Sequence, residues 1–368
     1  MSRRDAAMMR SMSARIAAAR LILSSLLLAA ASLPPPAAAG DAPAPPATGL
    51  QDGLVFSDYT PLSSGSELMR RVLSPLNALK VQRQLSGSGQ AVREQSIDLA
   101  HESFVAYVPA GAPPPRGYAL LVFVPPWQEA AVPQGWAPVL DRHGMILVSA
   151  ANSGNEEDVI DRRMPLALLA AQNMLRRYPV DPQRLYVGGF SGGSRVALHL
   201  ALDYPDLFRG ALLNAGSDAI GDAQIALPPR ELFARFQEST RLVYLSGERD
   251  EARLAEDIAS QQSLRQWCVA DLDTEPMPRA GHEPAGAAAL NRALDALDLH
   301  SAPDPAKLAA CRARIGQDVD AQLQQVQDLL AKDQPDQAQD LLSRIDAHYG
   351  GLAAPRSVEL ARKIDARP

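Results

Sequence analysis

Short apolar runs separated by helical stretches constrain the fold of this chain more than any other feature of its sequence. From Ala119 onward these runs are almost continuously apolar, which is typical of strands buried on both faces of a sheet. The predicted strands are Ser96–Leu99, Phe104–Val108, Ala119–Val124, Met145–Ser149, Leu185–Val187, Ala211–Leu213, Leu242–Leu245 and Val269–Leu272. The predicted helices between them are Glu156–Tyr178, Ser194–Leu202, Arg230–Phe236 and Ala252–Trp267. This alternation predicts a doubly wound α/β fold with a mostly parallel sheet.

The chain changes character on either side of this region, which divides its 368 residues into four predicted parts. We expect a signal peptide at residues 1–39, a linker and N-terminal extension at 40–93, the α/β domain at 94–302 and a helical hairpin tail at 303–368. In the tail, apolar residues recur at helical spacing, and a break at Asp333–Asp336 separates two helices. Two interpretations of this helical appendage stay open: a clasp packed on the main domain, or a platform that contacts a protein partner.

The first 39 residues have the pattern of a secretory signal peptide. Five arginines precede a mostly apolar run at Leu21–Ala31, and the alanines at Ala37–Ala39 offer a cleavage site. The run is too short to span a bilayer, and the Ala/Pro-rich stretch after Leu33 disfavours a helical membrane anchor. We therefore expect an exported protein, periplasmic or secreted, without stable membrane insertion after cleavage.

Charge and cysteine content narrow the function classes. The net charge is −6, so no basic footprint indicates nucleic-acid binding. Cys268 and Cys311 lie in no C-x-x-C motif and beside no histidine, which argues against a zinc site or a catalytic thiol, and we expect no cofactor. An oxidising compartment permits the two cysteines to pair, with two unrelated buried thiols as the alternative. Because Cys268 closes a predicted helix and Cys311 begins the tail, we predict a disulfide that ties the tail to the α/β domain.

The most informative motif is G-x-S-x-G at Gly189–Gly193, with Ser191 at its centre. An apolar strand precedes it and an Ala/Leu-rich helix follows, which is the context that a nucleophile elbow requires. A serine hydroxyl is a poor nucleophile unless a sharp turn presents it to a base, and small flanking residues let strand and helix approach closely. Ser191 is therefore the candidate nucleophile, with a structural tight turn as the alternative.

An orienting acid and then a histidine are expected to follow the serine along the chain. Asp250, on the loop after the predicted strand Leu242–Leu245, is the better acid, and Glu248 is the second choice. His282, on a Gly-flanked loop after Asp250, is the candidate base. The other five histidines lie in a helix, beside early strands or in the tail and its approach, and we interpret them as structural.

A tetrahedral intermediate at Ser191 would need two backbone N–H donors. Gly192, directly after the serine, would supply one, and the loop after the strand Ala119–Val124 would supply the other. Two prolines without N–H groups open this loop, so the expected donor is Trp127 or Gln128. The alternative for Trp127 is a wall residue with no part in the chemistry.

From about residue 102 to residue 297 the chain resembles the α/β-hydrolase superfamily, and within it secreted polyhydroxybutyrate-depolymerase-like and feruloyl-esterase-like enzymes. The run Tyr178–Ser194 is similar to the segment that leads into their nucleophile, and Tyr204–Gly210 is similar to the loop that follows. The resemblance implies an α/β-hydrolase fold and a triad of Ser191, Asp250 and His282. The oxyanion loop departs from the familiar His-Gly-Gly-Gly form, and the parts before residue 94 and after residue 303 lie outside the match.

These features together predict an exported serine hydrolase that cleaves a small-molecule or polymer-linked ester through an acyl-enzyme intermediate. Fewer than about thirty residues separate the strands that end near Leu213 and start at Leu242, too few for a large helical lid, which favours exposed or bulky esters. Asn152–Asn155 either lines the site or forms a plain turn. The alternatives are a serine peptidase or amidase, and a catalytically inactive hydrolase-like module that binds a partner.

Overall fold

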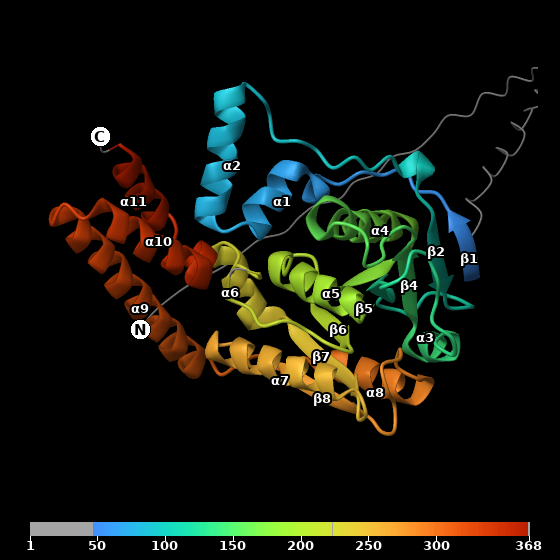
Figure 1. The fold of residues 1–368 in the computed structure, drawn as a ribbon. Helices are drawn as coiled ribbons and strands as arrows, with labels where there is room; N and C mark the ends of the chain where they lie inside the picture. The colour runs from blue at the N-terminus through green and yellow to red at the C-terminus, as the bar shows by residue number, and fades with distance from the viewer. Residues whose placement is uncertain (1–46, 223, 367–368) are drawn as a thin grey trace, which may run out of the picture. The chain divides into compact units, whose positions relative to one another are not determined.

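The computed structural model describes residues 47–222 and 224–366 (Figure 1). The predicted signal peptide at 1–39 and the first residues of the predicted linker lie outside this part of the chain. Among the described residues, no helix is both long enough and apolar enough to cross a membrane.

An eight-stranded sheet forms the centre of the fold, in the strand order β1-β2-β4-β3-β5-β6-β7-β8. β1 pairs antiparallel with β2 and β2 antiparallel with β4, while the other neighbouring pairs are parallel. The strands are β1 (Gly49–Leu54), β2 (Phe104–Val108), β3 (Tyr118–Val124), β4 (Met145–Ala150), β5 (Val180–Phe190), β6 (Gly210–Asn214), β7 (Arg241–Gly247) and β8 (Leu272–Met277). Parallel neighbours cannot be joined by a tight turn, so helices cross over between them.

Strand β3 shows why the central strands are apolar throughout. Successive side chains of a strand point to opposite faces of the sheet. Leu120 and Val122 belong to the core on one face, Leu121 and Phe123 belong to the core on the other, and all four are buried. Two separate hydrophobic cores therefore enclose the sheet, and helices must cover both.

Eleven α-helices of the described chain surround the sheet and extend beyond it (Figure 1). Side chains on and beside α3 and α8 form the core on one face, and those of α4, α5 and α7 contribute to the core on the other. The helices are α1 (Gly65–Val72), α2 (Pro75–Ser88), α3 (Ala137–His143), α4 (Met164–Arg177), α5 (Gly192–Asp203), α6 (Arg230–Ser239), α7 (Glu251–Gln266), α8 (Ala287–Leu297), α9 (Pro305–Ala331), α10 (Pro335–Tyr349) and α11 (Arg356–Asp365). The predicted doubly wound α/β fold with a C-terminal helical appendage is confirmed.

The sheet begins earlier in the chain than predicted. β1, α1 and α2 all lie within residues 40–93, where we expected a linker and an extension. The described chain from residue 47 onward is one compact unit whose sheet includes β1, so the α/β domain does not start at residue 94. β1 is an edge strand in which half-buried and exposed side chains are interspersed, so it lacks the apolar run that marks the central strands.

One predicted strand does not form, and the bounds of another are wrong. The segment Ser96–Leu99 pairs with no strand of the described chain, and a 3-10 turn at Leu99–His101 starts within it, capped by the side chain of Asp98. The strand predicted at Val269–Leu272 begins only at Leu272 and continues to Met277. In both places apolar residues pack into the core without strand pairing, so apolar character alone misplaced the strands.

The tail contains the predicted helical hairpin, α9 and α10, and a third helix, α11, that was not predicted. A disulfide joins Cys311 of α9 to Cys268 beyond α7, with the two Cα atoms 6.0 Å apart, as predicted. Arg312 donates to the Ala234 carbonyl and to the Gln237 side chain on α6, each within 2.7 Å. The tail therefore packs on the main domain as a clasp, while contact with a protein partner stays a prediction.

Candidate active site

Ser191 occupies the sharp turn between β5 and α5. Its backbone angles, φ 53° and ψ −122°, lie in a region that side-chain-bearing residues rarely adopt. The Ser191 N–H donates to the Asn214 carbonyl at 2.8 Å, and the Ser194 N–H donates to the Ser191 carbonyl at 2.9 Å. These hydrogen bonds hold Ser191 in a strained conformation at the carboxyl edge of the sheet, where the motif predicts a nucleophile.

Two positions of the motif require glycine, because other parts of the backbone lie too close to leave room for a side chain. A Cβ atom on Gly189 would lie 2.1 Å from the Gly193 carbonyl oxygen, and one on Gly193 would lie 1.9 Å from the Val124 carbonyl oxygen. The end of β3 therefore packs directly against the start of α5. This contact brings the loop after β3, which carries Trp127, beside the first turn of α5.

Ser191, His282 and Asp250 form a hydrogen-bonded relay. The Oγ of Ser191 lies 2.9 Å from Nε2 of His282, and Nδ1 of His282 lies 2.6 Å from Oδ2 of Asp250. A neutral imidazole that donates from Nδ1 to the carboxylate leaves Nε2 to accept from the serine hydroxyl. The Asp250 side chain is 10% exposed and that of His282 is 44% exposed, so the imidazole is accessible to solvent while the carboxylate behind it is shielded.

The second-choice acid, Glu248, has a different place. Its carboxylate accepts from the Arg279 N–H at 3.0 Å, and its own N–H donates to the Met277 carbonyl at 3.1 Å. Glu248 therefore holds the start of the loop that leads to His282. In the described chain, Asp250 is the carboxylate that contacts the imidazole.

A row of aromatic rings backs the relay. The Phe190 ring lies 4.9 Å from the His282 ring, and the Trp127 ring lies 6.1 Å from the Phe190 ring, measured between centroids. Packed rings at these separations attract one another and restrict each other's orientation. The Trp127 side chain thus forms a wall behind the His282 ring. The role of the Trp127 backbone N–H does not depend on this packing.

Gly192, the first of the expected oxyanion donors, directly follows Ser191. Gly192 is the first residue of α5, where a helix leaves N–H groups without intrahelical partners. Neither the Trp127 N–H nor the Gln128 N–H donates to a protein acceptor within residues 47–222 and 224–366. The assignment of Gly192 with Trp127 or Gln128 as oxyanion donors stays a prediction.

A buried arginine that sequence reasoning missed ties two loops of the site together. Nε of Arg163 donates to the Ser153 carbonyl and Nη2 donates to the Pro125 carbonyl, each at 2.9 Å. Arg163 is only 3% exposed and ends a π-helical turn before α4, an irregularity that is frequent at functional sites. The loops after β3 and β4 are thereby joined through one side chain.

A cavity of about 460 Å³ opens over Ser191. Asn155 reaches over the start of α5, since a Cβ atom on Gly192 would lie 2.0 Å from Oδ1 of Asn155. The other lining residues are Val159, Arg163, Ser191, Gly192, Arg195, Val196, His199, Asp218, Arg253 and His282. Of the two interpretations of Asn152–Asn155, the structure supports a loop that lines the site.

Three further lining residues were not expected from the sequence. Arg195 lies one helical turn after Ser191, a spacing that could have identified it. Arg253 lies in the first turn of α7, directly after the predicted acid. His199, interpreted as structural, also lines the cavity, and its Nδ1 lies 3.7 Å from Oδ2 of Asp203.

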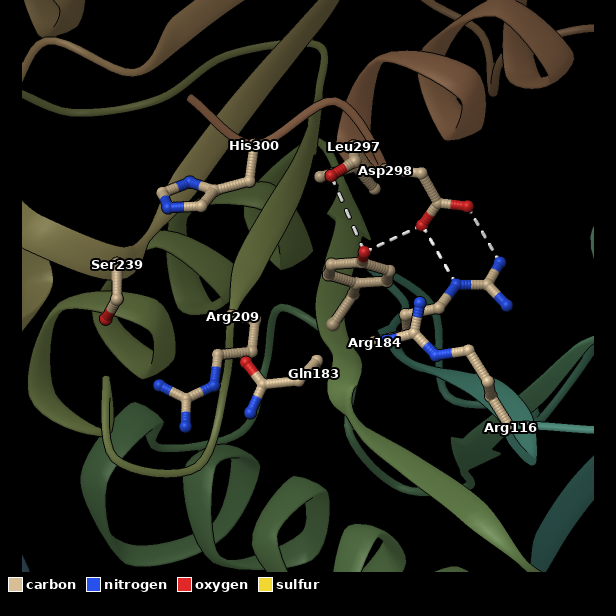
Figure 2. A pocket seen from close by; sticks show the side chains of 9 residues that line it. Arg116, Gln183, Arg184, Arg209, Ser239, Leu297, Asp298 and His300 are labelled. Atoms are coloured by element: carbon tan, nitrogen blue, oxygen red, sulfur yellow. Dashed lines mark hydrogen bonds and ion pairs between the residues drawn. The ribbon is translucent and has the colours of Figure 1, made fainter. Parts of the chain in front are cut away.

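A second cavity, of about 500 Å³, lies at the amino edge of the sheet (Figure 2). Ser239 and His300 both line it, but no hydrogen bond joins them: Ser239 donates to the Arg235 carbonyl, and His300 contacts Asp271. α6 and α8 end at this cavity, and its arginines offset the negative ends of those helices, so we interpret it as structural. Over the described ranges, no group of three or more His, Cys, Asp or Glu side chains could hold a metal ion.

Comparisons with known proteins add solved structures only, because no protein-family model and no curated sequence matches the chain. The chain is similar to a dipeptidyl peptidase 4 from Porphyromonas gingivalis (15% identity, TM-score 0.40, covering 54% of this chain and 33% of that one). It is also similar to an S-formylglutathione hydrolase from Staphylococcus aureus (11% identity, TM-score 0.40, covering 54% of this chain and 92% of that one). A third match is a poly(3-hydroxybutyrate) depolymerase from Bordetella parapertussis (18% identity, TM-score 0.40, covering 57% of this chain and 88% of that one). The chain thus spans about a third of the length of the peptidase.

These solved structures are hydrolases, and they include both esterases and peptidases. At such low sequence identity the similarity describes the fold and not the activity. The fold can be named from the chain itself. A mostly parallel eight-stranded sheet carries a strained serine on the turn after β5, with an acid and then a histidine on later loops. That is the arrangement of an α/β hydrolase, as the sequence resemblance implied.

Proposed function

We propose that this protein is a serine hydrolase that cleaves carboxylic esters, with Ser191 as nucleophile, His282 as general base and Asp250 as the orienting acid. The observation that carries the proposal is the relay itself, with contacts of 2.9 and 2.6 Å behind a serine on a strained turn. A hydroxyl bonded to a base, which is in turn held by a shielded carboxylate, is the arrangement that activates serine.

In the first half-reaction, the Ser191 Oγ attacks the ester carbonyl carbon while its proton passes to Nε2 of His282. Asp250 keeps the Nδ1–H oriented and stabilises the imidazolium that forms. The tetrahedral intermediate then collapses, the carbon–oxygen bond to the alcohol breaks, and the proton on Nε2 passes to the departing oxygen. The acyl group stays on Ser191 as an ester.

In the second half-reaction, a water molecule takes the place of the alcohol. His282 accepts one water proton as the oxygen attacks the acyl carbon, and a second tetrahedral intermediate forms. Its collapse breaks the bond to the Ser191 Oγ, which takes the proton back from Nε2. The carboxylic acid leaves, and the relay is restored.

The negative oxygen of both intermediates requires a positive environment. The Gly192 N–H and the Trp127 or Gln128 N–H are the proposed donors, and the amino end of α5 adds its partial positive charge. Arg163 supports this loop from behind, because its Nη2 holds the Pro125 carbonyl at 2.9 Å. The donors would therefore be in position before the substrate arrives.

The form of the site favours esters on exposed or bulky groups, whether small-molecule or polymer-linked. The connection between β6 and α6 contains no helix or strand among its described residues, so no helical lid covers the cavity there. The half-exposed His282 side chain agrees with an open site. Open clefts admit substrates whose remaining parts stay in solvent.

We also propose that the protein acts outside the cytoplasm, in the periplasm or as a secreted enzyme. The signal-peptide pattern of residues 1–39 and the Cys268–Cys311 disulfide support this location, because structural disulfides persist in oxidising compartments. Mass spectrometry of the exported protein should find an amino terminus close to Gly40 and no free thiol. Recovery of the protein with an uncleaved amino terminus from the cytoplasmic fraction alone would contradict the proposal.

A fluorophosphonate probe and p-nitrophenyl acetate test the enzymatic proposal directly. The wild-type chain should be labelled and should hydrolyse the ester, while Ser191→Ala should lose both, with at least about a thousandfold drop in kcat. Ser194→Ala, which removes a neighbouring hydroxyl from the same helix, should keep both properties. Activity of Ser191→Ala within tenfold of wild type would refute the assignment.

The same assay separates the alternative functions. Faster turnover of a peptidyl p-nitroanilide than of p-nitrophenyl esters would identify a peptidase or amidase that uses the same relay. A folded protein that neither takes up the probe nor hydrolyses either substrate would be an inactive hydrolase-like module.

A further inference from the structure

Cationic side chains outnumber anionic ones in the lining of the cavity over Ser191, against the trend of the chain. The whole sequence carries a net charge of −6, yet Arg163, Arg195 and Arg253 line this cavity, and Asp218 is the carboxylate that lines it with them. The three arginines come from the turn before α4, from α5 and from α7. A concave site whose lining has an excess of one sign of charge favours ligands of the other sign.

Two of these arginines are largely occupied by the protein. Nε of Arg195 lies 2.8 Å from Asp218, and its Nη2 lies 2.6 Å from Glu256. Nε and Nη2 of Arg163 both donate hydrogen bonds to backbone carbonyls. Burial lowers the pKa of Arg163 to about 10, so it remains charged at neutral pH. These two side chains contribute positive charge to the cavity but offer little free hydrogen-bonding edge.

Arg253 is different, because most of its guanidinium is unused. Its Nη1 donates to Glu256 at 2.7 Å, while its Nε and Nη2 have no hydrogen-bond partner among the described residues. The side chain is 28% exposed. The Nε–Nη2 edge of an arginine presents two parallel N–H donors that match the two oxygens of a carboxylate. Arg253 therefore lines the cavity that contains Ser191 and keeps a bidentate edge without a protein partner among the described residues.

The surrounding charges do not cancel this edge. Glu256 is shared between Arg195 and Arg253, and Asp218 is held by Arg195, so each of these carboxylates already has a cationic partner. α5 and α7 both begin at this edge of the sheet, at Gly192 and Glu251, and their amino ends add positive potential. The exposed carboxylate of Glu251 is the acidic group in the first turn of α7.

We propose that the substrate is an ester that itself carries a carboxylate, and that Arg253 binds this carboxylate through its Nε–Nη2 edge while Ser191 attacks the ester. This specificity rests on the proposed hydrolase function. It narrows the substrate class to esters with a free acid group on the acyl or the alcohol part, within the reach of one cavity.

Matched pairs of esters, in which one member carries a carboxylate and the other a neutral group at the same position, test the proposal. On the alcohol side, para-acetoxybenzoate is compared with para-acetoxybenzamide, and on the acyl side, mono-p-nitrophenyl adipate is compared with p-nitrophenyl hexanoate. In at least one pair, kcat/KM of the wild-type enzyme should favour the anionic member by about ten- to a hundredfold, the range set by a hydrogen bond to a charged group. The preference should shrink as salt is added.

Substitutions locate the preference on one side chain. Arg253→Gln should abolish the preference by lowering kcat/KM for the anionic ester while leaving the neutral ester within about twofold. Arg253→Lys should retain a reduced preference, because it keeps the charge without the two parallel donors. Arg249→Gln is the matched control, since Arg249 is exposed on the loop just before α7 and does not line the cavity.

The outcomes separate this inference from the function on which it rests. Equal kcat/KM for both members of both pairs, with hydrolysis intact, would overturn the role of Arg253 and leave the hydrolase standing. So would an Arg253→Gln loss that is the same for neutral and anionic esters. No Ser191-dependent hydrolysis of any ester would instead overturn the hydrolase itself.

Discussion

The turn after β7 carries two carboxylates, and at the scale of single residues the structure gives them separate tasks. Asp250→Asn should lower kcat for p-nitrophenyl acetate by several orders of magnitude, because an amide cannot stabilise the imidazolium of His282. Glu248→Gln should cost less than about tenfold, since a glutamine oxygen can still accept from the Arg279 N–H. Steady-state kinetics on both variants decides between them. A larger loss for Glu248→Gln would show that the acid is misassigned.

Asp257, on α7, is a third acid of this region, and it should control how stability depends on pH. It is 3% exposed, the Ser246 hydroxyl donates to it, and burial raises its pKa to about 7 from a usual value near 3.8. A carboxyl whose pKa is higher in the folded state stabilises the fold fully below pH 4. That contribution is lost as the pH rises from 4 through 7.

Asp257→Asn should therefore remove one pH-dependent term from the free energy of unfolding. Urea denaturation between pH 4 and pH 8 should show wild type losing stability relative to the variant by at most about 1.4 kcal/mol per pH unit up to pH 7, with a constant difference above it. Parallel curves for the two proteins would mean that Asp257 is ionised throughout.

At the scale of elements, the loops after β3 and β4 act as one unit because Arg163 joins them. Arg163→Met should lower kcat about tenfold or more with little change in KM, since both loops lose a charge-assisted tie near the proposed oxyanion donors. Hydrogen exchange should accelerate at the amides of residues 127, 128 and 151–155. Arg163→Lys keeps the charge but cannot reach both carbonyls as a fork, so it separates positioning from charge.

The control for this prediction is Arg176→Gln on α4, where the Arg176 side chain is 64% exposed and its nearest acid, Asp58, is 3.7 Å away. It should leave both kcat and hydrogen exchange unchanged. If Arg163→Met raised KM alone, the side chain would be a substrate contact rather than a tie between loops.

The central elements and the relay could be predicted from the sequence because their causes are local or follow from topology. An apolar strand, a glycine-flanked serine and an Ala/Leu-rich helix stand side by side in the chain, and parallel strands bring Asp250 and His282 to the same edge. β1 escaped prediction because an edge strand buries few side chains. Arg163 escaped because its partners, Pro125 and Ser153, lie in loops that only the folded sheet brings to it.

At the scale of the whole molecule, one covalent bond fixes the tail to the main domain. The Cys268–Cys311 disulfide spans 43 residues of sequence, and closing such a loop should stabilise the fold by roughly 3–4 kcal/mol. The Cys268→Ser/Cys311→Ser double variant should therefore unfold at lower urea concentration than oxidised wild type. Wild type treated with dithiothreitol should match the variant. A variant that is destabilised while reduced wild type is not would assign the effect to packing rather than to the cross-link.

The contact between α2 and α10 sets an order in which the fold can be completed. Asp346 on α10 accepts hydrogen bonds from Ser74 and from the Leu76 N–H at the start of α2, across about 270 residues of sequence. The start of α2 must therefore wait for one of the last helices before it finds this partner, and contacts of such long separation form slowly. The start of α2 therefore stays without its Asp346 partner until the tail has been synthesised, so this end of the fold is among the last parts to close.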